Sequence, residues 1–157
     1  MKLIQTGLIL LLFLLSTAVI ADNGLIIKPS VYSVAETLDR FENIASKKGI
    51  TIFARVNHAQ GAKKAGLTLA PTEVLIFGNP KLGTPLLLSQ RTVAIDLPLK
   101  AIAWKDKEGK VWLAYNSPDY IAKRHSIEDK QGVIKKMTGA LNKFSDFATK
   151  VPAKTTK

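Results

Sequence analysis

A capped amphipathic helix that runs directly into a strand determines the fold class of this 157-residue chain. Ser33 stands where a helix cap is expected, and Glu36, three residues later, completes the spacing of a capping box. Gly49 is typical of the residue that ends a helix. The apolar residues between these ends recur at helical spacing: Val34, Leu38, Phe41, Ile44 and Ala45. The pattern predicts a helix that buries one stripe against a sheet.

The residues that follow this helix alternate in polarity, as expected for a strand. The alternation assigns Ile50, Ile52, Ala54 and Val56 to one face and Thr51, Phe53 and Arg55 to the other. Further strands are predicted at residues 24–31, 73–77, 92–104 and 111–115. A kink is expected at Pro98, because proline cannot donate to a central ladder.

The remaining helices are predicted from their start positions. One begins at Asn79-Pro80 or, one turn later, at Thr84-Pro85. Others cover residues 118–124 and about 127–148, while residues 57–66 form a loop or a short helix. The overall order β-α-β-β-α-β-β-α predicts an α+β fold in which helices cover one face of an antiparallel sheet. One domain is expected over residues 22–150, followed by a basic tail at residues 151–157.

The N-terminal 21 residues have the three parts of a secretory signal peptide. Lys2 gives the positive start, residues 8–15 are an unbroken apolar run, and Ala21 ends the stretch. The alternative is a permanent membrane anchor. Cleavage after Ala21 is favoured because the apolar core is short for a bilayer span. No other segment approaches transmembrane length, so we expect a periplasmic or secreted protein without a membrane span after cleavage.

Composition excludes several kinds of chemistry. The chain has no cysteine, so disulfides, thiolate metal sites and cysteine nucleophiles are ruled out. The formal net charge of +11 favours anionic partners such as nucleic acid, acidic lipid head groups or envelope polymers, although it also keeps a protein in solution. Basic pairs such as Lys47-Lys48 and Lys135-Lys136 are spread along the chain rather than clustered.

A base-stacking platform needs aromatic and basic residues interleaved on one exposed face. Trp104, Trp112 and Tyr115 flank one hairpin, and Lys100 and Lys110 lie near them. This is too little for such a platform, so nucleic acid is not the expected partner.

Five polar residues stand where functional side chains often lie. The two histidines, His58 and His125, follow predicted elements in loop-like positions. Asp96 and Lys100 interrupt an apolar run, and a charge there is either exposed or paired. Asn79 lies at the turn between a strand and a helix. A fold that brought them together would form a small-ligand site.

Other chemistry is weakly supported. The histidines lack the close spacing of metal ligands, which favours hydrogen-bonding roles over a metal site. Residues 78–84 do not have the spacing of a phosphate-binding loop, and no nucleophile elbow is present. We therefore expect no cofactor and favour a protein without catalysis.

Several short motifs in order resemble the bacterial family catalogued as domain of unknown function 302. They are FARVNHA at 53–59, PTEVLIFGNP at 71–80, GTPL at 83–86, IDLPLK at 95–100 and WLAYN at 112–116, followed by Pro118, Tyr120 and His125. The resemblance implies a sheet-and-helix fold grouped with the TATA-binding-protein-like folds, often seen as dimers, and no established reaction. Fold likeness to a DNA-binding protein does not transfer DNA binding.

These observations predict an exported, dimeric binding module that holds a small ligand or a protein near His58, Asn79, Asp96, Lys100 and His125. One alternative is an enzyme of unknown reaction that uses the region of His58, Asp96 and His125. Another is an envelope-surface protein that acts through its basic residues, with the lysines at 136, 143 and 150 on one helix face.

Overall fold

The computed structural model describes residues 23–151, so the predicted signal peptide and most of the predicted tail lie outside the described residues. The elements, in chain order, are β1 (Leu25–Ser30), α1 (Val34–Lys47), β2 (Thr51–Asn57), α2 (His58–Lys64), β3 (Thr72–Gly78), α3 (Pro80–Ser89), the 3₁₀ helix η1 (Arg91–Ile95), β4 (Leu99–Lys105), β5 (Val111–Asn116), α4 (Pro118–Arg124) and α5 (Gln131–Thr149). The α+β class is confirmed, and residues 57–66, predicted as loop or helix, contain the short helix α2.

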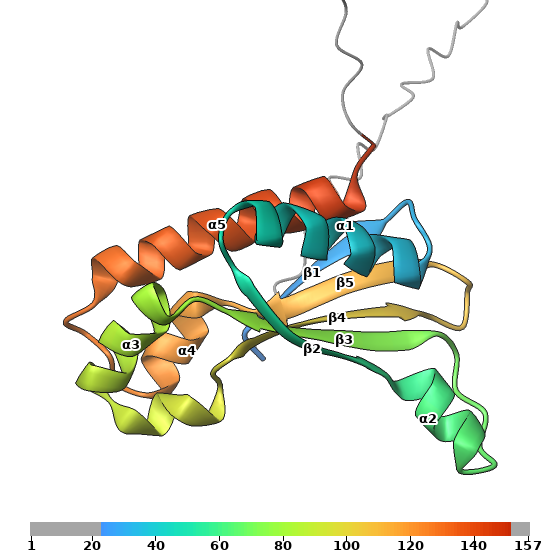
Figure 1. Ribbon diagram of the computed structural model, residues 1–157, viewed down its shortest axis with the longest axis horizontal. Coiled ribbons are helices and arrows are strands. Elements are labelled where there is room, and N and C mark those ends of the chain that lie inside the picture. Colours follow the sequence, from blue (N-terminus) through green and yellow to red (C-terminus); the bar gives the residue numbers. More distant parts are fainter. Residues whose placement is uncertain (1–22, 152–157) are drawn as a thin grey trace, which may run out of the picture.

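The five strands form one antiparallel sheet in the order β1-β5-β4-β3-β2. Helices α1 and α5 lie side by side over one face of this sheet (Figure 1). Helices α3 and α4 lie at one end of the strands, and α2 lies at the other end. The predicted arrangement of helices on one face of an antiparallel sheet is confirmed.

Helix α1 forms as its sequence predicts. The Ser33 hydroxyl accepts a hydrogen bond from the backbone N–H of Glu36 at 3.2 Å, and Gly49 has a φ of +73°, which favours glycine. Phe41 is fully buried between Phe77 and Phe144, with ring centroids 5.1 and 5.9 Å away. Burying one such ring contributes about 1.5–3 kcal/mol, so this aromatic trio anchors α1 and α5 to β3.

A second hydrophobic cluster lies below α5 at the end where α3 and α4 meet. Its fully buried or nearly buried members are Leu86, Val93, Ile121, Ala122, Ile127, Ile134 and Met137. Helix α3 begins at Pro80, and the side chain of Asn79 accepts from the N–H of Lys81 at 2.9 Å. Of the two predicted start positions the first is therefore correct, and Pro85 lies inside the helix. Asn79 thus marks the corner where β3 turns into α3.

Two predicted element boundaries are wrong. Residues 92–104 are not one kinked strand, because η1 precedes β4. Val93 is fully buried in the second cluster, and the N–H of Asp96 donates to its carbonyl at 3.0 Å, which closes a 3₁₀ turn. Helix α5 begins at Gln131 rather than near Ile127. Ile127 lies in the loop before the helix, and its side chain is buried.

The predicted faces of β2 are also wrong, because the strand contains a bulge. Ile52 pairs with Phe77, but Ala54 pairs with Ile76, so two residues of β2 advance the register by one. Ile52 and Arg55 therefore face the helices, and Ala54 and Val56 face the opposite side. Phe53, at the bulge, is 54% exposed.

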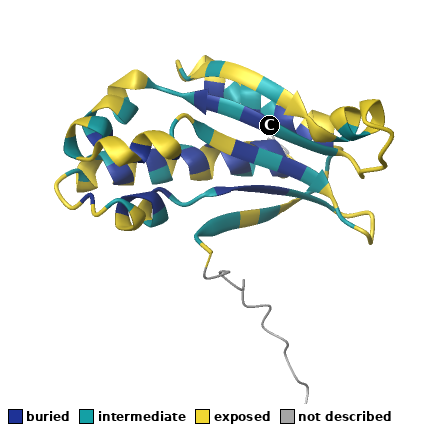
Figure 2. Cartoon of the chain, turned by 90° about the horizontal axis from the view of Figure 1, so that it is seen from below, coloured by how far each residue is buried: buried dark blue, intermediate teal, exposed yellow. Residues whose placement is uncertain are grey.

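The face of the sheet opposite α1 and α5 carries an apolar row. The row crosses all five strands through the paired residues Val56, Val74, Ile102, Ala114 and Ile27. Figure 2 shows this face from below, with strands visible between the helical segments at either end. Val56 and Ile27, at the sheet's two edges, are 41% and 42% exposed. Within residues 23–151, no helix combines the length and the apolar character needed to cross a bilayer.

Candidate functional site

A polar cluster joins η1 to the end of α4. The Nε2 atom of His125 lies 2.6 Å from a carboxylate oxygen of Asp96, and Arg124 donates to the other oxygen at 3.2 Å. The Nδ1 atom of His125 lies 3.0 Å from the Thr92 hydroxyl, and Lys100 donates to the backbone carbonyl of Asp96 at 3.4 Å. We call these five residues the Asp96 cluster. The side chains of Asp96 and His125 are only 8% and 7% exposed.

The five residues predicted as one surface do not form one. Asp96, Lys100 and His125 meet in the Asp96 cluster, with Lys100 on a carbonyl rather than on the carboxylate. Asn79 lies at the nearby start of α3. His58 begins α2, at the opposite end of the sheet (Figure 1), and is exposed. A ligand-binding role for these residues stays a prediction.

The order Thr92, His125, Asp96 matches that of a nucleophile, a base and an orienting carboxylate. However, Arg124 also binds Asp96, and none of the three residues lines the hollows described below. Each charged side chain in the cluster has at least one polar partner, and paired polar groups of this kind stabilise a fold. The cluster is therefore explained by its structural role, which is to hold the end of η1 against the end of α4. Sequence reasoning missed Thr92, which it placed in a strand, and Arg124.

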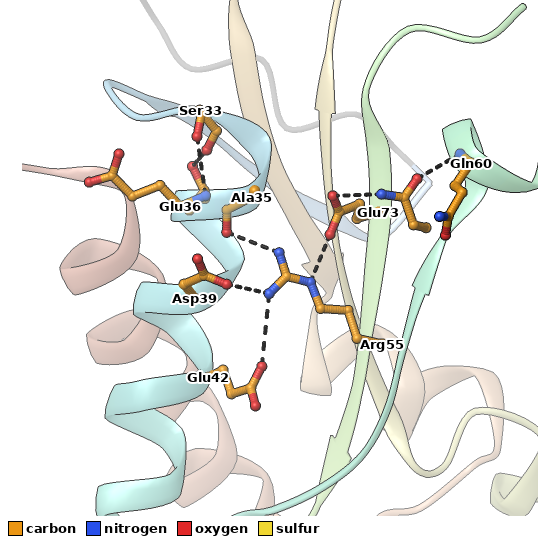
Figure 3. Close-up of polar contacts among 10 residues, drawn as sticks. Ser33, Ala35, Glu36, Asp39, Glu42, Arg55, Gln60 and Glu73 are labelled. Carbon is orange, nitrogen blue, oxygen red and sulfur yellow. Dashed lines mark hydrogen bonds and ion pairs between the residues drawn. The ribbon is translucent and has the colours of Figure 1, made fainter. Parts of the chain in front are cut away.

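A second polar cluster holds α1 to the sheet (Figure 3). Arg55 donates from Nε to Glu73 at 2.7 Å, from Nη2 to the carbonyl of Ala35 at 3.0 Å, and from Nη1 to Asp39. Burial opposes the positive charge, but hydrogen bonds to Asp39 and Glu73 outweigh it and raise the pKa of Arg55. Glu73 also accepts from Asn57 at 3.0 Å, so both of its carboxylate oxygens have partners. This cluster is structural.

Three adjoining hollows surround Asn79 where β3 becomes α3. The inner hollow, about 40 Å³, lies under α5, and its lining includes Phe77, Leu82, Leu97 and Phe144. The lower hollow, about 260 Å³, is lined by Phe53, Gly78, Asn79, Pro80, Gly83, Thr84, Leu87, Ala94, Leu97 and Pro98. It shares Gly78, Asn79, Gly83 and Leu97 with the inner hollow. An inner space of this size holds about one water, so larger molecules need its neighbours.

The third hollow is a groove of about 700 Å³ between α1, α3 and α5, which we call the lysine groove. It is lined by Ile44, Lys48, Ile50, Asn79, Leu82, Lys135, Lys136, Gly139, Ala140, Lys143, Phe144 and Phe147. The inner hollow lies next to it and shares Ile50, Asn79, Leu82, Ala140 and Phe144. Asn79 is common to all three hollows, and it is the one predicted site residue that lines any of them.

Two glycines keep space open at this corner. A Cβ atom on Gly78 would lie 3.3 Å from the ring of Phe53 and 3.5 Å from Pro98. A Cβ atom on Gly83 would lie 3.6 Å from a methyl group of Leu97, an ordinary contact. In residues 23–151 no group of three or more histidine and carboxylate side chains is arranged to hold a metal ion. The side chains that line the inner and lower hollows are mostly apolar, so the corner is suited to apolar groups.

Comparisons with known proteins agree on one family. A family model described as domain of unknown function DUF302 matches residues 26–144. A Brucella suis biovar 1 protein named fluoride-specific ion channel FluC 1 is 48% identical over 132 residues, which cover 82% of this chain and 52% of that protein. A Brucella melitensis biotype 1 protein named fluoride-specific ion channel FluC 2 is also 48% identical, with 49% of it covered. The chain thus spans about half the length of these relatives.

A solved structure has the same fold. The crystal structure of an uncharacterized conserved DUF302 protein from Bacillus stearothermophilus matches with a TM-score of 0.72 and 16% sequence identity. The match covers 80% of this chain and 98% of that one, so it shows the fold. Together with the match over residues 26–144, it places the chain in the DUF302 family of domains of unknown function.

Proposed function

We propose that this chain is a binding module for a small, largely apolar molecule held around Asn79. The observation that carries the proposal is the meeting of three hollows at this one residue. Ligand pockets have volumes of roughly 300–1,000 Å³ and mostly apolar walls with a few polar groups. The lysine groove, at about 700 Å³, falls in this range, and the lower hollow, at about 260 Å³, comes close.

Asn79 contributes a rigid polar corner to this site. Its side-chain oxygen accepts from Lys81, and its side-chain nitrogen donates to the carbonyl of Gly49 at 3.4 Å. These bonds fix the start of α3 against the end of α1. The side chain is half-buried, so its remaining N–H is available to orient a polar group of a bound molecule.

The proposal is tested with the neutral fluorescent probe N-phenyl-1-naphthylamine and the protein produced from the full chain. Replacing Gly83 by leucine extends a side chain into the inner and lower hollows from a position where the Cβ atom fits. Gly83→Leu is expected to weaken probe binding about tenfold. The control is Gly61→Leu in α2, where a Cβ atom meets nothing within 4 Å. Equal binding by both variants and the unchanged protein would contradict the proposal.

We further propose that the protein is exported, with its signal peptide removed after Ala21, and that it acts in the periplasm or outside the cell. The charged start at Lys2, the apolar run at residues 8–15 and the small residues before the cut support this. The Brucella relatives are named as ion channels, and a channel acts at a membrane, which agrees with a role in the cell envelope. Fluoride transport is not part of the proposal. The N-terminal residue of the protein from a periplasmic fraction tests the cleavage site.

We also propose that two copies associate through the open face of the sheet. The apolar row from Val56 to Ile27 supports this. Val56 and Ile27 are exposed, Val74 and Ile102 are half-buried, and only Ala114 is buried. Exposed apolar surface of this kind is typical of an interaction site. Placing a charge in the middle of the row with Ile102→Asp should convert dimer to monomer. Sedimentation velocity measures the change. A protein that is already monomeric at micromolar concentration would exclude the dimer.

A further inference from the structure

Four lysines surround the lysine groove without a counter-charge. Lys48 follows α1, and Lys135, Lys136 and Lys143 lie on α5. Within residues 23–151 none of these four ammonium groups forms an ion pair, and none of the described residues that line the groove is acidic. By contrast, Lys28 and Lys150 both pair with Asp146. Four like charges around one hollow produce a positive potential that an anionic ligand relieves.

The floor between these lysines is apolar. It consists of Ile44, Ile50, Leu82, Ala140, Phe144 and Phe147. Phe147 is 41% exposed, and the guanidinium of Arg40 lies over its ring, 4.9 Å from the centroid. Lysine side chains can lay their hydrocarbon stems along such a floor while their charged ends stay in water. The groove therefore combines an apolar bed with a cationic rim.

This combination discriminates among ligand classes. A small inorganic anion would use the rim and leave the floor exposed, whereas a neutral apolar molecule would use the floor and leave the four charges unpaired. A molecule with one anionic head and one hydrocarbon chain uses both. The floor borders the inner hollow at Ile50, Leu82 and Phe144. That hollow has room for about one water, so the chain would lie along the groove itself.

We infer that the ligand of this module is a single-chain anionic amphiphile, with a carboxylate or phosphate head bound by the lysines and its hydrocarbon chain on the floor of the lysine groove. The inference rests on the proposed function and names the ligand class of that site. A bilayer surface is the competing occupant. A groove of about 700 Å³ suits one chain lying along its floor better than a flat array of head groups.

The experiment compares dodecanoate with dodecanol, which share a chain and differ in charge. Calorimetric titration of the full chain should show that dodecanoate binds about tenfold more tightly. Combining Lys135→Gln, Lys136→Gln and Lys143→Gln should remove this preference and leave dodecanol affinity within about twofold. Inorganic phosphate and phosphatidylglycerol vesicles serve as the head-group and bilayer probes.

A second variant blocks the floor without touching a charge. A Cβ atom on Gly139 meets nothing within 4 Å, so Gly139→Leu is expected to fold with its side chain in the groove. It should weaken dodecanoate binding about tenfold. The matched control is Gly132→Leu on the same helix. A Cβ atom on Gly132 also meets nothing within 4 Å, but Gly132 does not line the groove. This control should bind like the unchanged protein.

Four results would overturn the inference. They are equal affinities for dodecanoate and dodecanol, an unchanged preference in the triple lysine variant, full displacement of dodecanoate by equimolar phosphate, and binding to vesicles but not to monomeric dodecanoate. If dodecanoate does not bind, but the neutral probe binds and Gly83→Leu weakens that binding, the amphiphile is excluded and the proposed function stands. If neither binds, both are wrong.

Discussion

The Asp96 cluster and the lysine groove are both built from charged side chains, but they differ in how each charge is balanced. In the Asp96 cluster one buried carboxylate receives His125 and Arg124, and His125 in turn contacts Thr92. In the lysine groove four cations share an apolar floor and have no acidic neighbour among the described lining residues. Polar atoms that satisfy one another hold a fold together, whereas unpaired charges beside a hollow are available to a ligand.

The comparison predicts its largest effect for Asp96→Ala. Removing the carboxylate leaves His125 buried without its partner, which should lower the free energy of unfolding by about 2–3 kcal/mol at pH 7. Arg124 is half-exposed and regains water, so the loss falls below that of a fully buried pair. Urea unfolding followed by circular dichroism measures the change.

The matched control for this variant is Asp129→Ala. Asp129 also accepts from a lysine and a hydroxyl, but its side chain is 57% exposed, so no measurable change is expected. Folded Asp96→Ala should keep dodecanoate affinity within about twofold, because Asp96 lines none of the three hollows. A stable Asp96→Ala variant with impaired binding would assign the cluster to the ligand site and reverse the comparison.

The sequence predicts local structure well where interactions between neighbouring residues determine it, as at helix ends. The Ser33 cap, the Gly49 terminator and the Asn79-Pro80 start of α3 are all confirmed. Prediction from the sequence fails where contacts between residues distant along the chain determine the local structure. The bulge after Ile52 depends on pairing with β3, and η1 forms because Val93 is buried by a distant cluster.

The contrast between short-range and long-range contacts also explains which parts of the two sites the sequence could predict. A charge inside an apolar run drew attention to Asp96, and the fold pairs it with His125 from 29 residues away. The basic pairs containing Lys48 and Lys135 are separated widely in sequence, so no pattern along the chain shows that they border one groove. Only the packing of α5 against α1 brings them together.

A second prediction tests whether the lysine groove keeps open space at the expense of stability. Gly139 lies in the interior of α5, where glycine is unfavourable relative to alanine. Because a Cβ atom there meets nothing within 4 Å, Gly139→Ala should raise the free energy of unfolding by about 0.5–1 kcal/mol. The urea midpoint measures this. A loss of stability would show that the floor of the groove does not have the space described.

A third prediction concerns repulsion among the groove lysines. Replacing Lys135, Lys136 and Lys143 by glutamine removes like charges that have no partner among the described residues. The thermal unfolding midpoint of this variant at low salt should be about 1 °C above that of the unchanged protein. The difference between the two proteins should vanish at high salt, because salt screens exposed charges. A lower unfolding temperature at low salt would mean that these lysines stabilise the fold, as the Asp96 cluster does.

A fourth prediction concerns Asp146, the carboxylate that pairs with Lys28 and with Lys150 of α5. A hydrogen bond from Lys28 lowers the pKa of Asp146, burial opposes the shift, and Lys150 adds to it. A lowered folded pKa gives stability that is present above the unfolded value of about 3.9 and is lost as pH falls through the folded value. Asp146→Asn should therefore be less stable than the unchanged protein at pH 7, by less than about 1 kcal/mol because the carboxylate is 47% exposed.

The difference between the two proteins should shrink as the pH falls below about 4, because protonation removes the charge that the variant already lacks. Urea titrations at several pH values measure it, and Glu128→Gln, at an exposed position, provides the control. A difference that stayed constant down to low pH would mean that Asp146 acts through its shape rather than its charge. In that case the ion pairs of Lys28 and Lys150 would add nothing to stability. Pairing on α5 would then no longer distinguish the lysines that stabilise the fold from those available to a ligand.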